Sequence, residues 1–259
     1  MTGGAVRRLA PLRRLHLSAQ VRVVAAAVAA AWVVCAWLWL GASGGAAGAS
    51  ASTWWCAPGM AFAGVGSSRS GDGLLGGTSM WLLMTAAMAL PGELPAAQYV
   101  ATNSFPRHRS SGVAVFVLVY LAAWLTFGLG ATALASRLAG SSADALFAIV
   151  LGLAACYELT PLKRRALARC HRGAALPPDG PRRLAAVSRF GWINASGCVA
   201  SCGPAMAAAL LVPVAQPLAM GALAVAMTYE RLTRRPLTAR RRIAAGYLAV
   251  AACFALAGL

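Results

Sequence analysis

The sequence predicts an all-α protein, a polytopic bundle of about seven transmembrane helices with its amino terminus in the cytoplasm. Three observations predict this fold. Hydrophobic residues make up 59% of the chain and charged residues only 11%, whereas soluble domains carry roughly 25% charged residues. Long apolar stretches recur along the chain, and a helix needs ~20 apolar residues to cross a bilayer. The basic residues fall almost entirely in alternate loops. We therefore expect a single membrane domain.

Apolar stretches define the predicted spans. They cover residues 22–40, 79–100, 112–135, 144–161, 190–212, 216–230 and 243–259. The chain divides around them into a basic cytoplasmic N-terminus (1–21), a first span or signal anchor (22–40), an outer Gly/Ala/Ser-rich loop (41–78), a five-span core (79–235), and a basic loop with the last span (236–259). The first span is either an uncleaved anchor or a cleaved signal peptide. Its apolar run exceeds the usual ~7–15 residues of a signal peptide, which favours the anchor.

The net charge of +17 follows the positive-inside rule. Lys and Arg cluster in the N-terminus and in the second, fourth and sixth loops, and only Arg69 and Arg137 lie in the alternate loops. This distribution places the clusters in the cytosol and the chain in the inner or plasma membrane. Such a charge on a soluble protein would suggest nucleic acid. Here its placement indicates the lipid bilayer as the partner and argues against nucleic acid.

Two predicted spans carry stripes of sulfur side chains. Met80, Met84 and Met88 recur every four residues in the second span, and Cys198, Cys202 and Met206 do so in the fifth. Residues four apart lie on one face of a helix. Thiolates and thioethers are soft ligands that suit Cu(I). The alternative is packing, because Met fills irregular gaps and Cys behaves as a small apolar residue.

Three of the six acidic residues lie in or at the ends of spans: Glu93, Glu158 and Glu230. Ionisable groups inside a bilayer are costly and are candidates for function. Two of these acids can instead pair with bases at their own helix ends. The nearest bases are Lys163 and Arg164 for Glu158, and Arg231 and Arg234 for Glu230.

Glu93 has no basic neighbour within its own span, and Pro91 and Pro95 flank it. These prolines free backbone carbonyls that can act as ligands or bind water. We therefore add Glu93 to the primary metal candidates, Met80, Met84, Met88, Cys198, Cys202 and Met206. The secondary candidates are Cys156, Glu158, Cys170, His171, Met227 and Glu230.

Four segments resemble a bacterial family of predicted metal-binding integral membrane proteins known as domain of unknown function 2182. The resemblance runs from about Met80 to Arg235 and implies metal binding and copper handling. At three positions where the family commonly has Cys or Met, this chain has Ala89, Ala166 and Ser201. The chain therefore resembles a divergent member of the family. The segments are Trp81-x-x-Met84-x-x-Ala87-Met88-x-x-Pro91, Tyr120-Leu121-x-x-Trp124-x-x-Phe127-Gly128, Tyr157-x-Leu159-Thr160-Pro161-Leu162-Lys163 followed by Cys170, and Gly197-Cys198-Val199-Ala200-Ser201-Cys202-x-x-x-Met206.

The first functional hypothesis is an integral membrane protein that binds a soft metal, with Cu(I) as the expected ion, for copper handling as a chaperone, insertion factor or passage. The second is a metal-independent transporter or channel that uses the buried Glu residues. The third is a structural subunit of a membrane complex. A membrane, periplasmic or extracellular protein partner fits the first and third. Motifs of common enzymes are absent from the sequence, so we expect no enzymatic activity.

Overall fold

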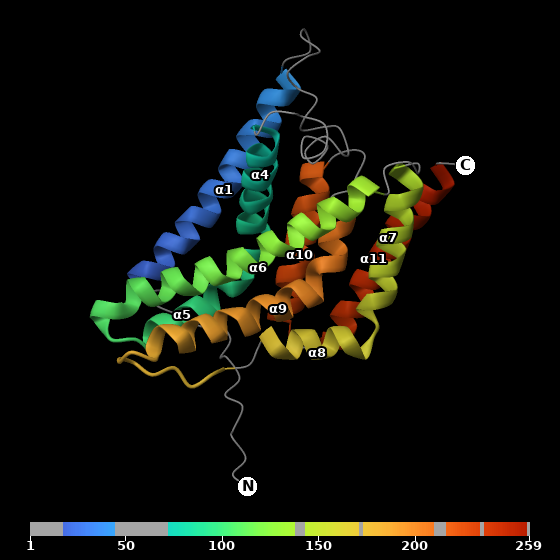
Figure 1. The fold of residues 1–259 in the computed structure, drawn as a ribbon. Helices are drawn as coiled ribbons and strands as arrows, with labels where there is room; N and C mark the ends of the chain where they lie inside the picture. The colour runs from blue at the N-terminus through green and yellow to red at the C-terminus, as the bar shows by residue number, and fades with distance from the viewer. Residues whose placement is uncertain are drawn as a thin grey trace.

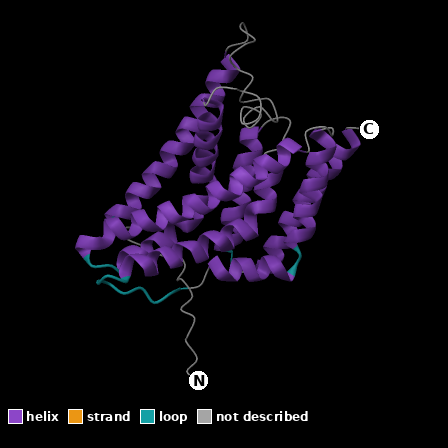
Figure 2. Cartoon of the chain, viewed as in Figure 1, coloured by secondary structure: helices purple, strands orange, loops and turns teal. Residues whose placement is uncertain are grey.

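The computed structural model describes residues 18–44, 72–137, 143–170, 173–209, 216–233 and 236–257. Over these residues every regular element is helical and no strand occurs (Figure 2). The predicted all-α class is therefore confirmed. The elements are α1 (Ala19–Gly44), α4 (Asp72–Ala89), the 3₁₀ helix η1 (Leu90–Glu93), α5 (Leu94–Thr102), the 3₁₀ helix η2 (Pro106–His108), α6 (Arg109–Arg137), α7 (Ala143–Glu158), α8 (Pro161–Cys170), α9 (Arg183–Ala209), α10 (Gln216–Leu232) and α11 (Pro236–Ala257).

The long helices α6 and α9 pack against each other through the middle of the bundle (Figure 1). Helices α1 and α4 pair on one side of them, and α7 and α11 pair on the other. Helix α10 contacts α4, α9 and α11. The short helix α8 packs on α9 and runs across the lower end of the bundle in Figure 1. The faces of α4, α8, α9 and α10 can therefore share one interior.

Fewer helices qualify as membrane spans than the predicted seven. Among the described residues, two helices are long and apolar enough to cross a membrane, at Ala19–Ala36 and Pro106–Leu134. A third qualifies if Leu146–Glu158 and Pro161–Cys170, which meet at an angle of 75°, form one broken span. The count of seven is therefore corrected to two or three on this criterion. Two physical reasons explain the difference. The helices α7 and α10 are short, with 16 and 17 residues, and η1 breaks the second predicted span. The helices α9 and α11 are long enough, but α9 carries many small and polar residues and α11 contains three consecutive Arg residues.

The second predicted span breaks at Pro91, where α4 gives way to η1. Proline has no N–H, so it cannot donate to the carbonyl four residues before it. That carbonyl belongs to Ala87, and the Trp32 indole N–H of α1 donates to it at 2.8 Å. The break therefore leaves the Ala87 carbonyl free to accept from Trp32, and this hydrogen bond links α1 to α4.

Helix α9 repeats this arrangement at Pro204, which lies inside the helix. Pro204 leaves the Ala200 carbonyl without its helical donor. The Tyr157 hydroxyl, at the end of α7, donates to that carbonyl at 2.7 Å. The hydrogen bond made possible by this second proline links α7 to α9 at Ala200, between Cys198 and Cys202.

The chain bends sharply between α7 and α8, by 75°. Thr160 starts α8 as its cap, and its hydroxyl accepts the Lys163 backbone N–H at 3.3 Å. Pro161 occupies the first helical position, where a missing N–H costs nothing. The Arg240 guanidinium of α11 donates to the carbonyls of Glu158 and Thr160. Arg240 therefore supplies the donors that the end of α7 lacks.

Close packing of α4 on α6 depends on a glycine. The Trp81 indole N–H donates to the Trp124 carbonyl at 2.8 Å, and its ring lies against Gly128. A Cβ at Gly128 would overlap atoms Nε1, Cε2 and Cδ1 of the Trp81 indole. Trp81 also lies beside the rings of Trp124 and Phe127, at centroid distances of 6.5 and 6.3 Å.

We predict that Gly128→Ala destabilises the protein by about 1–3 kcal/mol, because the added methyl group must displace a packed indole. Gly130→Ala is the matched control, since a Cβ there meets no atom within 4 Å and alanine favours the helix by up to ~1 kcal/mol. Denaturant unfolding of both variants in detergent measures the difference. Equal unfolding midpoints for the two variants would contradict the packing described.

Candidate metal centre

The two sulfur stripes lie in one buried cluster. Met84 and Met88 of α4, and Cys198, Cys202 and Met206 of α9, are at most 2% exposed and belong to the same apolar core. Their four-residue spacing places each set on one helix face, and both faces point inward. The predicted ligands therefore do not face the exterior, and both stripes contribute to the same interior.

Other sulfur atoms join this cluster from two further helices. Met220 and Met227 of α10 and Cys170 of α8 are buried in it. Met227 and Cys170 are secondary candidates from the sequence, where no spacing relates them to the stripes on α4 and α9. The remaining primary sulfur candidate, Met80, belongs to α4, but its side chain lies outside the described part of the structure.

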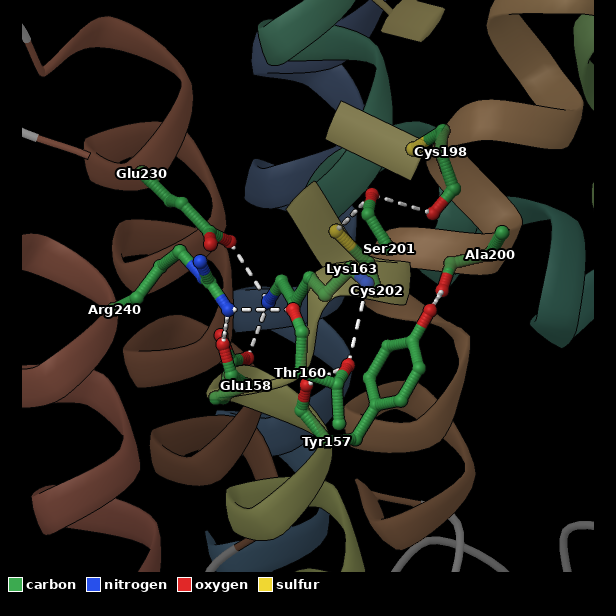
Figure 3. Close-up of polar contacts among 10 residues, drawn as sticks. All are labelled: Tyr157, Glu158, Thr160, Lys163, Cys198, Ala200, Ser201, Cys202, Glu230 and Arg240. Carbon is green, nitrogen blue, oxygen red and sulfur yellow. Dashed lines mark hydrogen bonds and ion pairs between the residues drawn. The ribbon is translucent and has the colours of Figure 1, made fainter. Parts of the chain in front are cut away.

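Hydroxyl groups contact both thiols of α9. The Tyr120 hydroxyl of α6 donates to Cys198 Sγ at 2.9 Å. Ser201 Oγ donates to the Cys198 carbonyl at 3.0 Å and lies 3.4 Å from Cys202 Sγ (Figure 3). Tyr120 is fully buried and Ser201 is 2% exposed. The two thiols are therefore held within a network of buried hydroxyl groups.

Cys170 of α8 lies against α9 at Gly197, one residue before Cys198. Its Sγ lies 3.6 Å from the Ala166 carbonyl oxygen and 3.8 Å from the Asn194 carbonyl oxygen. A Cβ at Gly197 would lie 2.9 Å from that sulfur, so glycine allows α8 to pack closely here. The two neighbouring secondary candidates behave differently. Cys156 is exposed, and His171 lies outside the described residues.

The ligand chemistry of this cluster depends on methionine. Over the described ranges, no group of three or more His, Cys, Asp or Glu side chains is arranged to hold a metal ion. A hard or borderline ion that needs nitrogen and oxygen ligands therefore finds no ready site among them. Two thiols and several thioethers in a dry interior suit a soft, singly charged ion such as Cu(I).

Glu93 is paired, although its own span offers it no base. It lies at the end of η1 with a side chain 3% exposed, and Arg231 of α10 contacts its Oε1 through Nη1. Arg231 also packs against Gly92. A buried carboxylate is costly unless a charge and hydrogen bonds compensate it. Glu93 therefore joins η1 to α10 in the structure, and one of its oxygens is engaged by Arg231.

The other two glutamates share one lysine. Lys163 Nζ contacts Glu158 Oε1 and lies 2.9 Å from Glu230 Oε2, and all three side chains are at most 3% exposed (Figure 3). The pairing of Glu158 with Lys163 matches one alternative from the sequence. Glu230 also pairs with Lys163, because the bend after α7 carries Lys163 into the interior. Arg231 contacts Glu93 instead, and Arg234 lies outside the described residues.

Sequence reasoning did not predict the burial of Lys163, Arg231 and Arg240, because it counts all three among the cytoplasmic loop charges. A signal for the first was present. Lys163, Ala166, Leu167 and Cys170 recur at the spacing of one helix face, and all four are buried in α8. The other two lie at helix ends, and their burial depends on which helix packs opposite.

We predict that Arg231→Met destabilises the protein by about 3–5 kcal/mol, because it leaves the Glu93 carboxylate buried without a counter-charge. Adding Glu93→Gln to that variant should restore part of the loss. Arg242→Met, at an exposed position, should stay within about 0.5 kcal/mol of wild type. Unfolding in detergent tests all three variants. If Arg231→Met is as stable as the Arg242→Met control, the stabilising role of the buried Glu93–Arg231 pair is refuted.

The family comparison agrees with this soft-ligand chemistry. The model of one family, PpoB2, described as copper chaperone, matches residues 78–255, which is more than half of the chain. The matched region includes both sulfur stripes and runs past Arg235, where the motif resemblance ends, into α11. The matched model does not carry the name of the domain of unknown function that the motifs resemble. No curated protein and no solved structure matches the chain. On the family match, the chain belongs to the PpoB2 family of copper chaperones.

Proposed function

We propose that this protein is an integral membrane protein that binds Cu(I) inside its helix bundle and passes it on as part of copper handling. The observation that carries the proposal is the shared burial of the two sulfur stripes on α4 and α9. The family's copper-chaperone description supports it independently. The ligands proposed are Met84, Met88, Cys198, Cys202 and Met206, with Met80 as a further candidate.

Copper is the cargo in this proposal, so binding must be selective and reversible. Thiolates and thioethers select Cu(I) over harder ions. Met side chains are flexible and polarisable, so they can follow the ion as its coordination changes during transfer. The buried cluster excludes water, which would otherwise compete for the ion. Cys170 and the two Met residues of α10 provide additional sulfur beside the proposed ligands.

Membrane integration is supported by the apolar exteriors of two helices. Val23 and Val33 of α1 and Leu118, Leu129 and Leu134 of α6 are between 43% and 69% exposed. A row of large apolar residues facing outward marks a surface that contacts lipid or another apolar partner. Both helices also meet the length and hydropathy required for a span. We propose that α1 and α6 cross the membrane of the cell.

The orientation in the membrane follows from the exposed bases. Helices α1, α6, α9 and α11 all begin near the lower end of the bundle in Figure 1, where α8 lies. Arg164, Arg165 and Arg169 are exposed on α8, and Arg182 is exposed just before α9. The positive-inside rule places this basic end in the cytosol.

The alternatives receive less support. In a metal-independent channel the carboxylates of Glu93, Glu158 and Glu230 would face a cation path. In the structure each of them contacts a buried Lys or Arg side chain, which neutralises the charge such a path needs. A structural subunit would bind its partner without copper. We expect no enzymatic activity, since the proposed ligands bind a cargo ion and carry out no reaction.

We predict that the purified protein, loaded anaerobically, binds Cu(I) stoichiometrically and that Cys198→Ala combined with Cys202→Ala abolishes the binding. The double variant removes both thiols while leaving the Met residues, and thioethers alone are neutral and do not compensate the charge of the ion. Copper per chain is measured by elemental analysis after desalting.

The matched control is Cys156→Ala combined with Cys253→Ala, because both of these cysteines are free and exposed. It removes the same number of thiols and should retain wild-type copper. Retention of copper by the Cys198/Cys202 variant, or equal loss in both double variants, would refute the assignment.

Membrane integration has its own test. We predict that the expressed chain stays in the membrane pellet after washing with alkaline carbonate and enters solution only with detergent, because α1 and α6 bury their apolar faces in lipid. Immunoblotting of pellet and supernatant measures the distribution. Recovery in the carbonate supernatant would exclude an integral membrane protein and leave the copper proposal to be judged separately.

A further inference from the structure

We infer that the Tyr120 hydroxyl is a positioning group for the copper-binding thiol of Cys198. This inference rests on the proposed function, because it concerns how the same site holds its cargo. Tyr120 is fully buried in α6, and its hydroxyl donates to Cys198 Sγ across 2.9 Å. The neighbouring Phe116 ring stacks on it at a centroid distance of 6.4 Å. The phenol is therefore held in place by packing before any metal arrives.

The two thiols of α9 differ in the hydrogen bonds that they receive. Ser201 has a single hydroxyl hydrogen, which it donates to the Cys198 carbonyl at 3.0 Å. Its oxygen lies 3.4 Å from Cys202 Sγ, a longer contact in which either atom can donate. Tyr120, by contrast, points a donor at Cys198 Sγ. Of the two sulfurs, Cys198 thus has the shorter hydroxyl contact and the one in which the hydroxyl is the donor.

A donor on sulfur has two consequences for metal binding. It fixes the direction of the Cys198 side chain, so less order has to be created when the ion binds. It also occupies one lone pair of the sulfur and stabilises negative charge there, while leaving the other lone pairs for the ion. Groups that orient a ligand in this way typically change metal affinity by about 10–100-fold.

The test compares two tyrosine variants that each lose one hydroxyl directed at α9. Tyr120→Phe removes the donor to sulfur and keeps the packed ring. Tyr157→Phe is the matched control, because its hydroxyl donates to the Ala200 carbonyl and not to a thiol. Competition with a chromophoric Cu(I) chelator measures affinity, and ultraviolet absorption of the loaded protein reports the Cu(I)–thiolate bond. Thermal unfolding of the copper-free variants checks that both are folded.

For Tyr120→Phe we expect about 10–100-fold weaker Cu(I) binding and a shift of the thiolate absorption to longer wavelength, since the sulfur lone pair loses its hydrogen bond. Tyr157→Phe should leave the absorption unchanged, because its hydroxyl donates to a carbonyl and not to sulfur. Wild-type affinity and absorption in Tyr120→Phe would overturn the inference while leaving copper binding intact. Equal weakening in Tyr157→Phe, or weaker binding without a spectral shift, would assign the effect to packing and also overturn it. Failure of the wild-type protein to bind Cu(I) would instead remove the proposed function.

Discussion

Backbone carbonyls freed by proline control how this bundle is arranged. A carbonyl that loses its helical donor must be satisfied by another group or by water, and at both prolines a side chain of a neighbouring helix supplies the donor. The carbonyl freed by Pro91 pairs with Trp32, and the one freed by Pro204 pairs with Tyr157. These carbonyls belong to Ala87, next to Met88, and to Ala200, midway between Cys198 and Cys202. The contacts that satisfy the backbone therefore also fix the helices that carry the sulfur stripes.

Charge balance is the second constraint on the interior. Three buried carboxylates, on Glu93, Glu158 and Glu230, lie beside three of the buried bases, Lys163, Arg231 and Arg240. The pairs connect η1 with α10, and α8 with both α7 and α10. Several of their atoms have no protein partner, including Glu158 Oε2, Glu230 Oε1 and Arg240 Nε. Such orphaned atoms are typical places for buried water. The polar network thus stands beside the sulfur cluster and ties together the helices that form it.

The sequence predicts some of these features well and misses others for physical reasons. The helical class and the inward faces of Met84, Met88, Cys198 and Cys202 follow from composition and four-residue spacing, which are local properties. The number of membrane spans does not follow, because an apolar stretch reveals neither the 3₁₀ break at Pro91 nor the 75° bend before Pro161.

The partner of Glu93 lies 138 positions away in the sequence, and no spacing rule reaches that far. The burial of Lys163 could be predicted only in part. Its helical spacing indicates a buried face, whereas its charge suggests a loop. The side chain of Met80 and the residue His171 lie outside the described structure, so their place in the site stays a prediction.

Sulfur atoms from α4 and α9 are proposed to bind one Cu(I) ion in a buried interior. X-ray absorption at the copper edge of the anaerobically loaded protein distinguishes this site from any other. We expect a first coordination shell made of sulfur, which changes in Met84→Leu as well as in Cys202→Ala, because both helices supply ligands. A shell of nitrogen or oxygen atoms, or a sulfur shell that is unaffected by the change on α4, would contradict it.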